Sequence, residues 1–248
     1  MNEGDIQLMN KFLTEVTDRE NGKRILLSVK YNRINKINLI ILRALVQEQG
    51  KRGLFVTVDR PHKYMEYLLD LNKIPKDGLI FLDVISRFSG ESSSPRCDVA
   101  SNASPFKISE LMDLMESGGG GSDARVASID FGLLDFVMID NLGAMLAYNE
   151  LEDVSAFIQR YMKLIERYGR IFTAIVMDVR ALPEFYRTIQ GLCQREFLVS
   201  DDGNLLPLGN LAAPGTVGDK PKDVGESVLL FAPEKPLPFG AVPRPEGI

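Results

Sequence analysis

The chain has few of the residues that build cross-linked or metal-rich folds. Its 248 residues include two cysteines, Cys97 and Cys193, and a single histidine, His62. A disulfide framework needs several cysteine pairs, so it is excluded, and the low cysteine content is typical of a reducing compartment. One histidine also excludes a metal centre built from several imidazoles.

Long apolar runs and an excess of positive charge are missing as well. The longest apolar stretch, residues 37–46, is interrupted by Asn38 and Arg43, whereas a membrane helix needs about 18–20 apolar residues in succession. The beginning, MNEGDIQLMNKF, lacks the basic and then apolar pattern of a secretory signal. A net charge of −5 disfavours binding to nucleic acid through charge alone. We therefore expect a cytoplasmic protein with no membrane contact.

Short apolar runs that are typical of buried strands alternate with amphipathic helical patterns. Runs without polar alternation are buried on both faces, which favours a parallel sheet covered by helices on both sides. The predicted fold class is therefore α/β, with a mostly parallel sheet in three layers. We expect strands at 25–29, 54–58, 79–84, 136–139 and 172–177, and helices at 5–17, 39–49, 62–71, 108–115, 151–168 and 184–193.

The character of the chain changes near its C-terminus. Residues 196–200 and 204–208 predict a β-hairpin, because the intervening Asp201-Asp202-Gly203 is typical of a tight turn. Residues 227–231 predict a last strand. Eight of the thirteen prolines follow residue 206, which favours an extended tail. We expect an N-terminal helical segment (1–22), an α/β domain (23–232) and a Pro-rich tail (233–248).

Two segments are set apart by composition. Residues 86–105 are polar and predict a surface loop. Residues 118–122 read GGGGS, which is identical to a common engineered linker. Four successive glycines are too flexible to fix a phosphate cradle, so this stretch is left out of the functional reasoning.

The best place to look for chemistry is the carboxyl edge of the sheet. Ligands of open α/β sheets bind beyond the carboxyl ends of the strands. The turns that lie there contain residues 30–37 after the first strand, Asp59 after the second, Asp140-Asn141 after the fourth, and Asp178 and Arg180 after the fifth.

Two strand-end phrases resemble motifs of a known family. LFVTVDRP (54–61) and FVMIDNLGAML (136–146) resemble the RecA superfamily, and its KaiC/RadA-like branch in particular, over roughly residues 20–210. The resemblance implies a three-layer RecA-like fold with a phosphate-binding loop after the first strand. It also implies that Asp59 is the catalytic acidic residue that orients water, and that Asp140, followed by Asn141, coordinates Mg²⁺ through water.

The phosphate loop departs from the family pattern of Gly, four residues, Gly, Lys and Ser or Thr. When Lys36 is aligned with the lysine, Lys30 and Asn35 replace the glycines, and Ile37 replaces the hydroxyl residue. Glycines let the backbone N–H groups approach the phosphates, and the hydroxyl ligates Mg²⁺. The loop therefore keeps one of four required features.

Two interpretations of this turn stay open. Lys30, Arg33 and Lys36 surround a predicted helix N-terminus, where a phosphate or another acidic group could bind. In the other interpretation the turn only connects two elements, with Lys36 solvated and Asn35 capping the helix through its side chain.

The acidic residues also have structural interpretations. Asp140 would then cap the turn that follows its strand, and Asp59 would be a turn residue or an ion-pair partner of Lys36. Asp178 and Arg180 are expected at the surface, and His62 is expected to be solvated at a helix start. Cys193 is expected to be a small core residue.

These observations predict a degenerate RecA/KaiC-like protein, without ATP hydrolysis, that acts as a regulatory or scaffolding subunit. Its expected partners are further copies of the chain or a RecA/KaiC-like relative, and no cofactor is expected. The first alternative is an ATP-binding protein with weak or no Mg²⁺-dependent hydrolysis through Lys36 and Asp140. The second is a recombinase paralogue that binds DNA through a local Lys/Arg-rich face.

Overall fold

The computed structural model describes residues 3–16, 23–85, 99–101, 108–116 and 129–208. The chain divides into two units, of which the first ends at Leu211; the second lies outside the described residues. The predicted strand at 227–231, the Pro-rich tail and the GGGGS stretch also lie outside them, as does the predicted domain boundary after residue 232.

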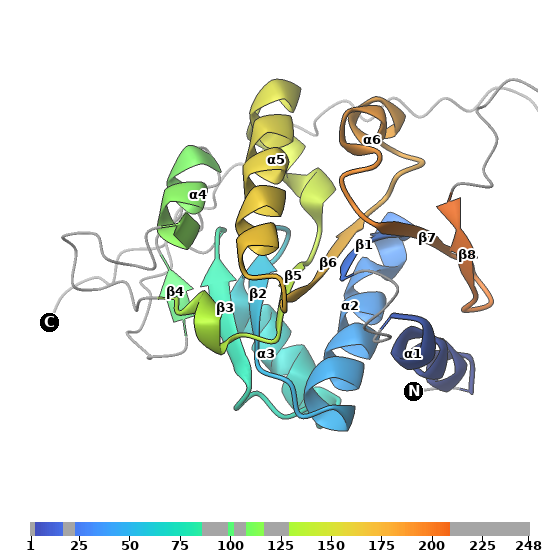
Figure 1. The fold of residues 1–248 in the computed structure, drawn as a ribbon. Coiled ribbons are helices and arrows are strands. Elements are labelled where there is room, and N and C mark those ends of the chain that lie inside the picture. Colours follow the sequence, from blue (N-terminus) through green and yellow to red (C-terminus); the bar gives the residue numbers. More distant parts are fainter. Residues whose placement is uncertain (1–2, 17–22, 86–98, 102–107, 117–128, 209–248) are drawn as a thin grey trace, which may run out of the picture. The chain divides into compact units, whose positions relative to one another are not determined.

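One sheet organises the described part of the chain (Figure 1). Its strand order is β4-β3-β2-β5-β6-β1-β7-β8. Every neighbouring pair is parallel except β7 and β8, which are antiparallel. The predicted α/β class with a mostly parallel sheet is therefore confirmed. The strands are β1 (Arg24–Ser28), β2 (Gly53–Thr57), β3 (Leu79–Asp83), β4 (Val99–Ser101), β5 (Phe136–Ile139), β6 (Phe172–Met177), β7 (Arg195–Val199) and β8 (Leu205–Pro207).

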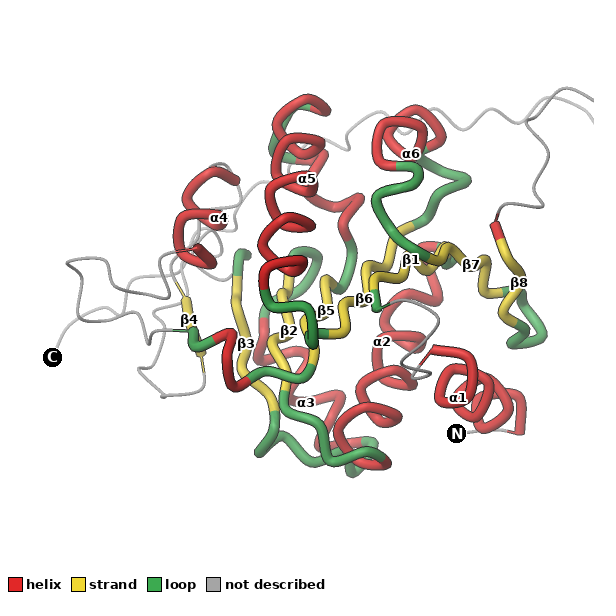
Figure 2. Tube along the Cα trace, in the orientation of Figure 1, coloured by secondary structure: helices red, strands yellow, loops and turns green. Residues whose placement is uncertain are grey.

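Helices cover both faces of this sheet (Figure 2). Alternate strand residues point to opposite faces, and they divide between two apolar clusters. Leu27 and Phe55 join the cluster that includes the helices α1, α2 and α3. Leu26 and Val56 join the cluster that includes α4, α5 and α6. The helices are α1 (Glu3–Val16), α2 (Ile34–Leu42), α3 (His62–Leu71), α4 (Ile108–Glu116), α5 (Leu151–Arg167) and α6 (Pro183–Ile189).

The helix after β1 begins earlier than the sequence predicts. We expected it at residue 39, but a 3₁₀ turn at Tyr31–Arg33 leads directly into α2 at Ile34. Ile34, Ile37 and Ile41 follow helical spacing and are buried, so apolar packing outweighs the polar residues between them. A π-helical stretch, Arg43–Glu48, continues α2. The predicted start at residue 39 is therefore wrong.

Two further elements adjust the sequence-based picture. Residues 99–101 form the short edge strand β4 inside the segment expected to be a loop. The predicted hairpin is present as β7 and β8, and Gly203 in its turn has a φ of 82°, which favours glycine. Pro207 ends β8 at the other edge of the sheet and lies opposite Phe197.

The N-terminal helix α1 packs onto the sheet domain. Leu8 and Phe12 are buried in the cluster that contains α2, and the Phe12 ring meets the Phe172 ring edge to face at 6.1 Å between centroids. Burial of two large apolar side chains supplies the main driving force for this contact. The packing places the acidic first turn of α1 close to the start of α2.

Candidate functional site

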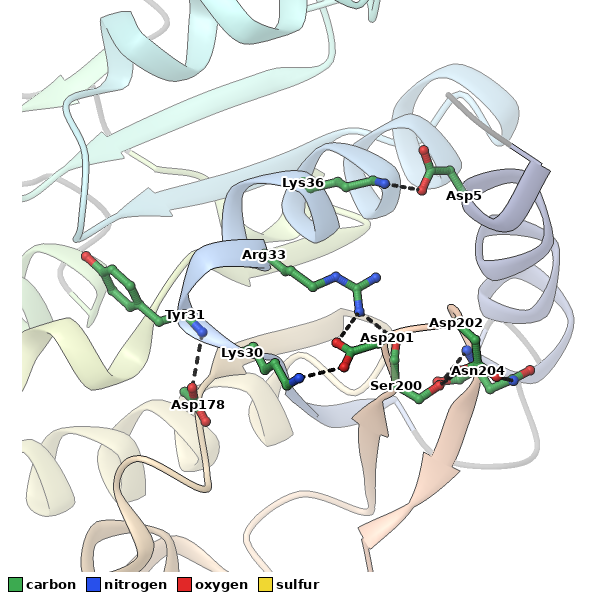
Figure 3. A network of polar contacts seen from close by, with 10 residues as sticks. All are labelled: Asp5, Lys30, Tyr31, Arg33, Lys36, Asp178, Ser200, Asp201, Asp202 and Asn204. Carbon is green, nitrogen blue, oxygen red and sulfur yellow. Dashed lines mark hydrogen bonds and ion pairs between the residues drawn. The ribbon is translucent and has the colours of Figure 1, made fainter. Parts of the chain in front are cut away.

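The turn after β1 contains the cations that were candidates for anion binding (Figure 3). Two of them reach the hairpin turn. Lys30 Nζ lies 2.5 Å from Asp201 Oδ2, and Arg33 Nη1 lies 3.3 Å from Asp201 Oδ1. Arg33 Nη1 also donates to the carbonyl oxygen of Ser200 at 2.7 Å. The hydrogen bond from Lys30 lowers the pKa of Asp201, so this carboxylate stays charged beside the two cations.

Lys36, the lysine retained from the family pattern, faces the N-terminal helix. Its Nζ lies 2.6 Å from Oδ1 of Asp5 in the first turn of α1. Asp5 is 8% exposed, so the pair is shielded on the side of the carboxylate. Lys36 is therefore neither fully solvated nor paired with Asp59, as the structural interpretations had suggested.

Tyr31 joins the turn to the ends of two other strands. Its backbone N–H donates to Oδ2 of Asp178 at 3.1 Å, and its hydroxyl donates to Oδ1 of Asp59 at 3.1 Å. Burial, followed by the charge of Asp59, raises the pKa of the Tyr31 hydroxyl. The phenol thus stays protonated, and its hydroxyl donates to the carboxylate of Asp59. This is the residue that the resemblance implies is catalytic. Asp178 also accepts from the backbone N–H groups of Arg180 and Ala181.

Asp140 is buried at the end of β5. It is 2% exposed, and Oδ1 accepts from the Val58 N–H at 2.8 Å. Burial raises the pKa of Asp140 to about 7, with a smaller contribution from the charge of Asp59. The Asn38 side chain on α2 donates through Nδ2 to the Asp140 carbonyl oxygen at 3.1 Å. Asn141, which follows, is buried as well.

Two expectations about polar residues near this edge are wrong. His62 is 7% exposed rather than solvated, and its Nδ1 lies 2.5 Å from Oδ2 of Asp83, which also accepts from the His62 backbone N–H. Asn35 does not cap α2, because it lies one residue inside the helix and the N-cap residue is Arg33. Because α2 begins at Ile34, the capping position falls on Arg33 and not on Asn35.

Five of the buried polar side chains at this edge are neighbours in a row, which the sequence did not reveal. Thr57 lies opposite Asp83 in the pairing of β2 with β3. It also follows Val56, which lies opposite Ile139, so Thr57 is beside Asp140. Strand neighbours lie about 4.8 Å apart. We define the buried polar row as His62, Asp83, Thr57, Asp140 and Asn38; each of its members is at most 7% exposed.

The resemblance implies a magnesium–nucleotide complex, and the residues at the turn can be tested against it. Ile37 offers no oxygen and is fully buried among apolar side chains. Lys36 is ion-paired with Asp5, and the Asp59 carboxylate accepts from Tyr31. These residues do not fit a magnesium–nucleotide complex. The binding and catalytic roles of Lys30, Arg33, Asn35, Lys36, Asp59, Asp140 and Asn141 stay predictions.

The described residues contain no group of three or more histidine, cysteine or acidic side chains arranged to hold a metal ion. Asp140, the predicted magnesium ligand, is thus not part of a multi-carboxylate centre within that part of the chain. Nor is any helix in the described ranges both long enough and apolar enough to cross a membrane.

The fold and the site define an α/β protein with a parallel central sheet, helices on both faces and acidic strand ends. Comparison with known proteins finds no matching family model and no matching curated protein. Many solved structures are similar in fold, and two of them are compared with this chain. One is a KaiC-like protein from the hyperthermophilic archaeon Pyrococcus horikoshii OT3, with 12% identity, a TM-score of 0.49, and coverage of 71% of this chain and 72% of that chain.

The other is the flagellar accessory protein FlaH from Methanocaldococcus jannaschii. It has 12% identity and a TM-score of 0.45, with coverage of 75% of this chain and 76% of that chain.

Proposed function

We propose that this chain is a RecA/KaiC-like protein that does not hydrolyse ATP and acts as a regulatory or scaffolding subunit through protein–protein contacts. One observation carries the proposal: the three cations at the turn after β1 are already paired with carboxylates of the same chain. Lys30 and Arg33 contact Asp201, and Lys36 contacts Asp5.

A triphosphate would have to compete with these internal carboxylates. Asp5 and Asp201 are tethered to the same chain, so their effective concentration near the cations is high. Each of these partly exposed pairs contributes little to stability, because solvent screens the charges. Together, however, they offset two of the three positive charges that would attract a nucleotide. The turn also lacks both glycines that would bring the backbone N–H groups toward phosphate.

Calorimetric titration with ATP, with and without Mg²⁺, tests the absence of a working nucleotide site. We expect no saturable binding tighter than about 1 mM, and phosphate release at the background rate. Lys36→Ala serves as the comparison variant, and it should behave as the wild type does. Micromolar affinity for ATP that Lys36→Ala abolishes would contradict the proposal and favour an ATP-binding protein.

A variant that frees the cations tests the observation itself. In Asp5→Asn/Asp201→Asn, the lysines and Arg33 lose their carboxylate partners, and Arg33 keeps only its hydrogen bond to the Ser200 carbonyl oxygen. We therefore expect measurable binding of inorganic tripolyphosphate that weakens with salt. Asp202→Asn is the matched control, because Asp202 accepts from Ser200 and Asn204 and contacts none of these cations. Equal binding by wild type and both variants would show that the carboxylates are not the obstacle.

The surface of α3 supports the part of the proposal that concerns protein contacts. Tyr64, Tyr67 and Leu71 are 40%, 60% and 65% exposed, and their spacing places them on one side of the helix. Large apolar side chains gathered on one exposed face are typical of protein interaction sites. The partner proposed here is a second copy of the chain or a RecA/KaiC-like relative.

A further inference from the structure

The buried polar row contains two oxygen atoms that the protein does not satisfy. Asn38 Oδ1 and Thr57 Oγ1 have no hydrogen-bond partner, although both residues are fully buried. Native proteins rarely leave buried polar atoms unpaired, because such atoms have lost their hydrogen bonds to water and gained nothing in return. Two such atoms on residues that neighbour Asp140 indicate that something else contacts them.

Both residues are adjacent to Asp140, from different sides. Asn38 reaches it from α2, by donating through Nδ2 to the Asp140 carbonyl oxygen. Thr57 lies beside it on β2, as the pairing of Val56 with Ile139 requires. The Val58 N–H donates to Asp140 Oδ1, which fixes the carboxyl group near the end of β2. Asn38 on α2, Thr57 at the end of β2 and Asp140 after β5 are therefore buried neighbours.

The charge at this place is not balanced by the described side chains. The cations nearest in sequence are paired elsewhere: Lys36 with Asp5, and Arg60 with Asp59. No ion pair joins Asp140 to a cation within the described ranges. The other carboxylate of the row, Asp83, accepts from His62 and from the Ile85 N–H, so its oxygens are engaged. What remains is a carboxylate that accepts from backbone N–H groups but has no cation partner, together with two unpartnered neutral oxygens.

We propose that Asn38 Oδ1, Thr57 Oγ1 and the Asp140 carboxylate bind one desolvated sodium ion beneath α2. A hard cation prefers oxygen ligands, and a single positive charge neutralises the single carboxylate. The ion accounts for both unpartnered oxygens at once. The site does not depend on the proposed function, since it uses no residue of the turn after β1.

Thermal unfolding of the full chain tests the site. Calorimetry is run at about pH 8.5, at constant ionic strength, with sodium chloride progressively replacing choline chloride. A ligand that binds only the folded state raises its melting temperature. We expect a saturable rise of about 3 °C or more. Choline is too large to enter, so equal melting temperatures in the two salts would overturn the proposal and favour an internal water molecule.

Variants locate the effect within the row. Thr57→Val keeps the shape of the side chain but removes its oxygen, and Asp140→Asn removes the charge. Both should lose most of the sodium-dependent rise. Asp178→Asn is the matched control at the next strand end, and it should keep the rise. If Asp140→Asn retains the full rise, sodium acts elsewhere and the assignment is wrong. The wild-type comparison stands even where a variant does not fold.

Discussion

Asp140 combines burial with a titratable group, and it makes the stability of the protein depend on pH. Its pKa is raised from 3.8 to about 7 by burial, so the folded chain holds a proton that the unfolded chain has lost. The contribution of protonated Asp140 to the free energy of unfolding is fully present below about pH 4 and is lost as pH rises through 7. The loss is on the order of 4 kcal/mol.

Asp140→Asn should remove this slope. In sodium-free buffer, the unfolding free energy of the wild type minus that of the variant should fall between about pH 4 and 7, as measured by urea unfolding followed by circular dichroism. Taking the difference cancels the opposite contribution of Asp201, whose pKa is lowered. A difference that stays flat over this range would show that Asp140 is ionised throughout.

The thiol of Cys193 should be unreactive in the folded protein. Burial, with a smaller contribution from the charge of Glu196, raises its pKa to about 12. The thiolate is the reacting species, so its fraction near pH 8 falls roughly a thousandfold. In a Cys97→Ser background, a thiol reagent should label the native chain slowly and the urea-unfolded chain rapidly. Cys193 is partly buried against the core, and fast labelling of the native protein would show that its thiolate forms readily in the folded state.

For single residues, the sequence identifies the candidate site residues but not the side chains that they contact. Asp59, Asp140 and Asp178 could be placed at strand ends because each follows an apolar run. Their contacts depend on how distant segments pack, and Asp5 on α1 and Asp201 in the hairpin gave no local signal. His62 and Asp83 were separated by a whole helix and strand, so their pairing required the parallel alignment of β2 with β3.

At the scale of elements, α1 is held mainly by apolar contacts. Phe12 is 1% exposed and packs against Phe172. Phe12→Ala should therefore cost about 3–5 kcal/mol, whereas Asp5→Asn, which breaks a pair with a half-exposed lysine, should cost about 1 kcal/mol or less. Urea unfolding of the two variants measures both. A larger loss in Asp5→Asn would mean that charge holds the helix.

Strand β2 begins at a glycine because a ring lies against it. A Cβ at Gly53 would come within 2.3 Å of the Phe136 ring on β5, so Gly53→Ala should destabilise the protein by about 1–3 kcal/mol. Phe136→Leu should recover part of that loss in the double variant, because the shorter side chain leaves room. Additive losses in this double-mutant cycle would show that the two sites do not interact.

Elements were predictable where the apolar pattern was uninterrupted. The strand at 136–139, the strand at 172–177 and the helix at 62–71 have the expected bounds. The start of α2 was missed because NRINKIN looks polar, although its isoleucines face the core. Strand β4 was missed because three residues of a polar segment pair only with β3, and local composition does not show such pairing.

For the whole molecule, the exposed side of α3 predicts self-association. If copies of the chain meet there, Tyr67→Glu should weaken the assembly at least tenfold, because it places a charge in an apolar contact. Light scattering over a range of concentrations measures this. Glu66→Gln, a change at a less exposed neighbouring position, is the control. A strict monomer that copurifies with no relative would contradict the scaffolding proposal.

The hairpin edge limits how copies can join. β8 spans three residues, runs against the direction of its neighbours and ends in Pro207, which has no N–H to offer an incoming strand. A strand of a neighbouring subunit therefore pairs poorly with β8, and the sheet does not easily continue from one subunit into the next. We therefore expect any oligomer interface at this edge to form through side-chain contacts. Side chains can distinguish one partner from another, whereas backbone hydrogen bonds between strands are the same for every sequence.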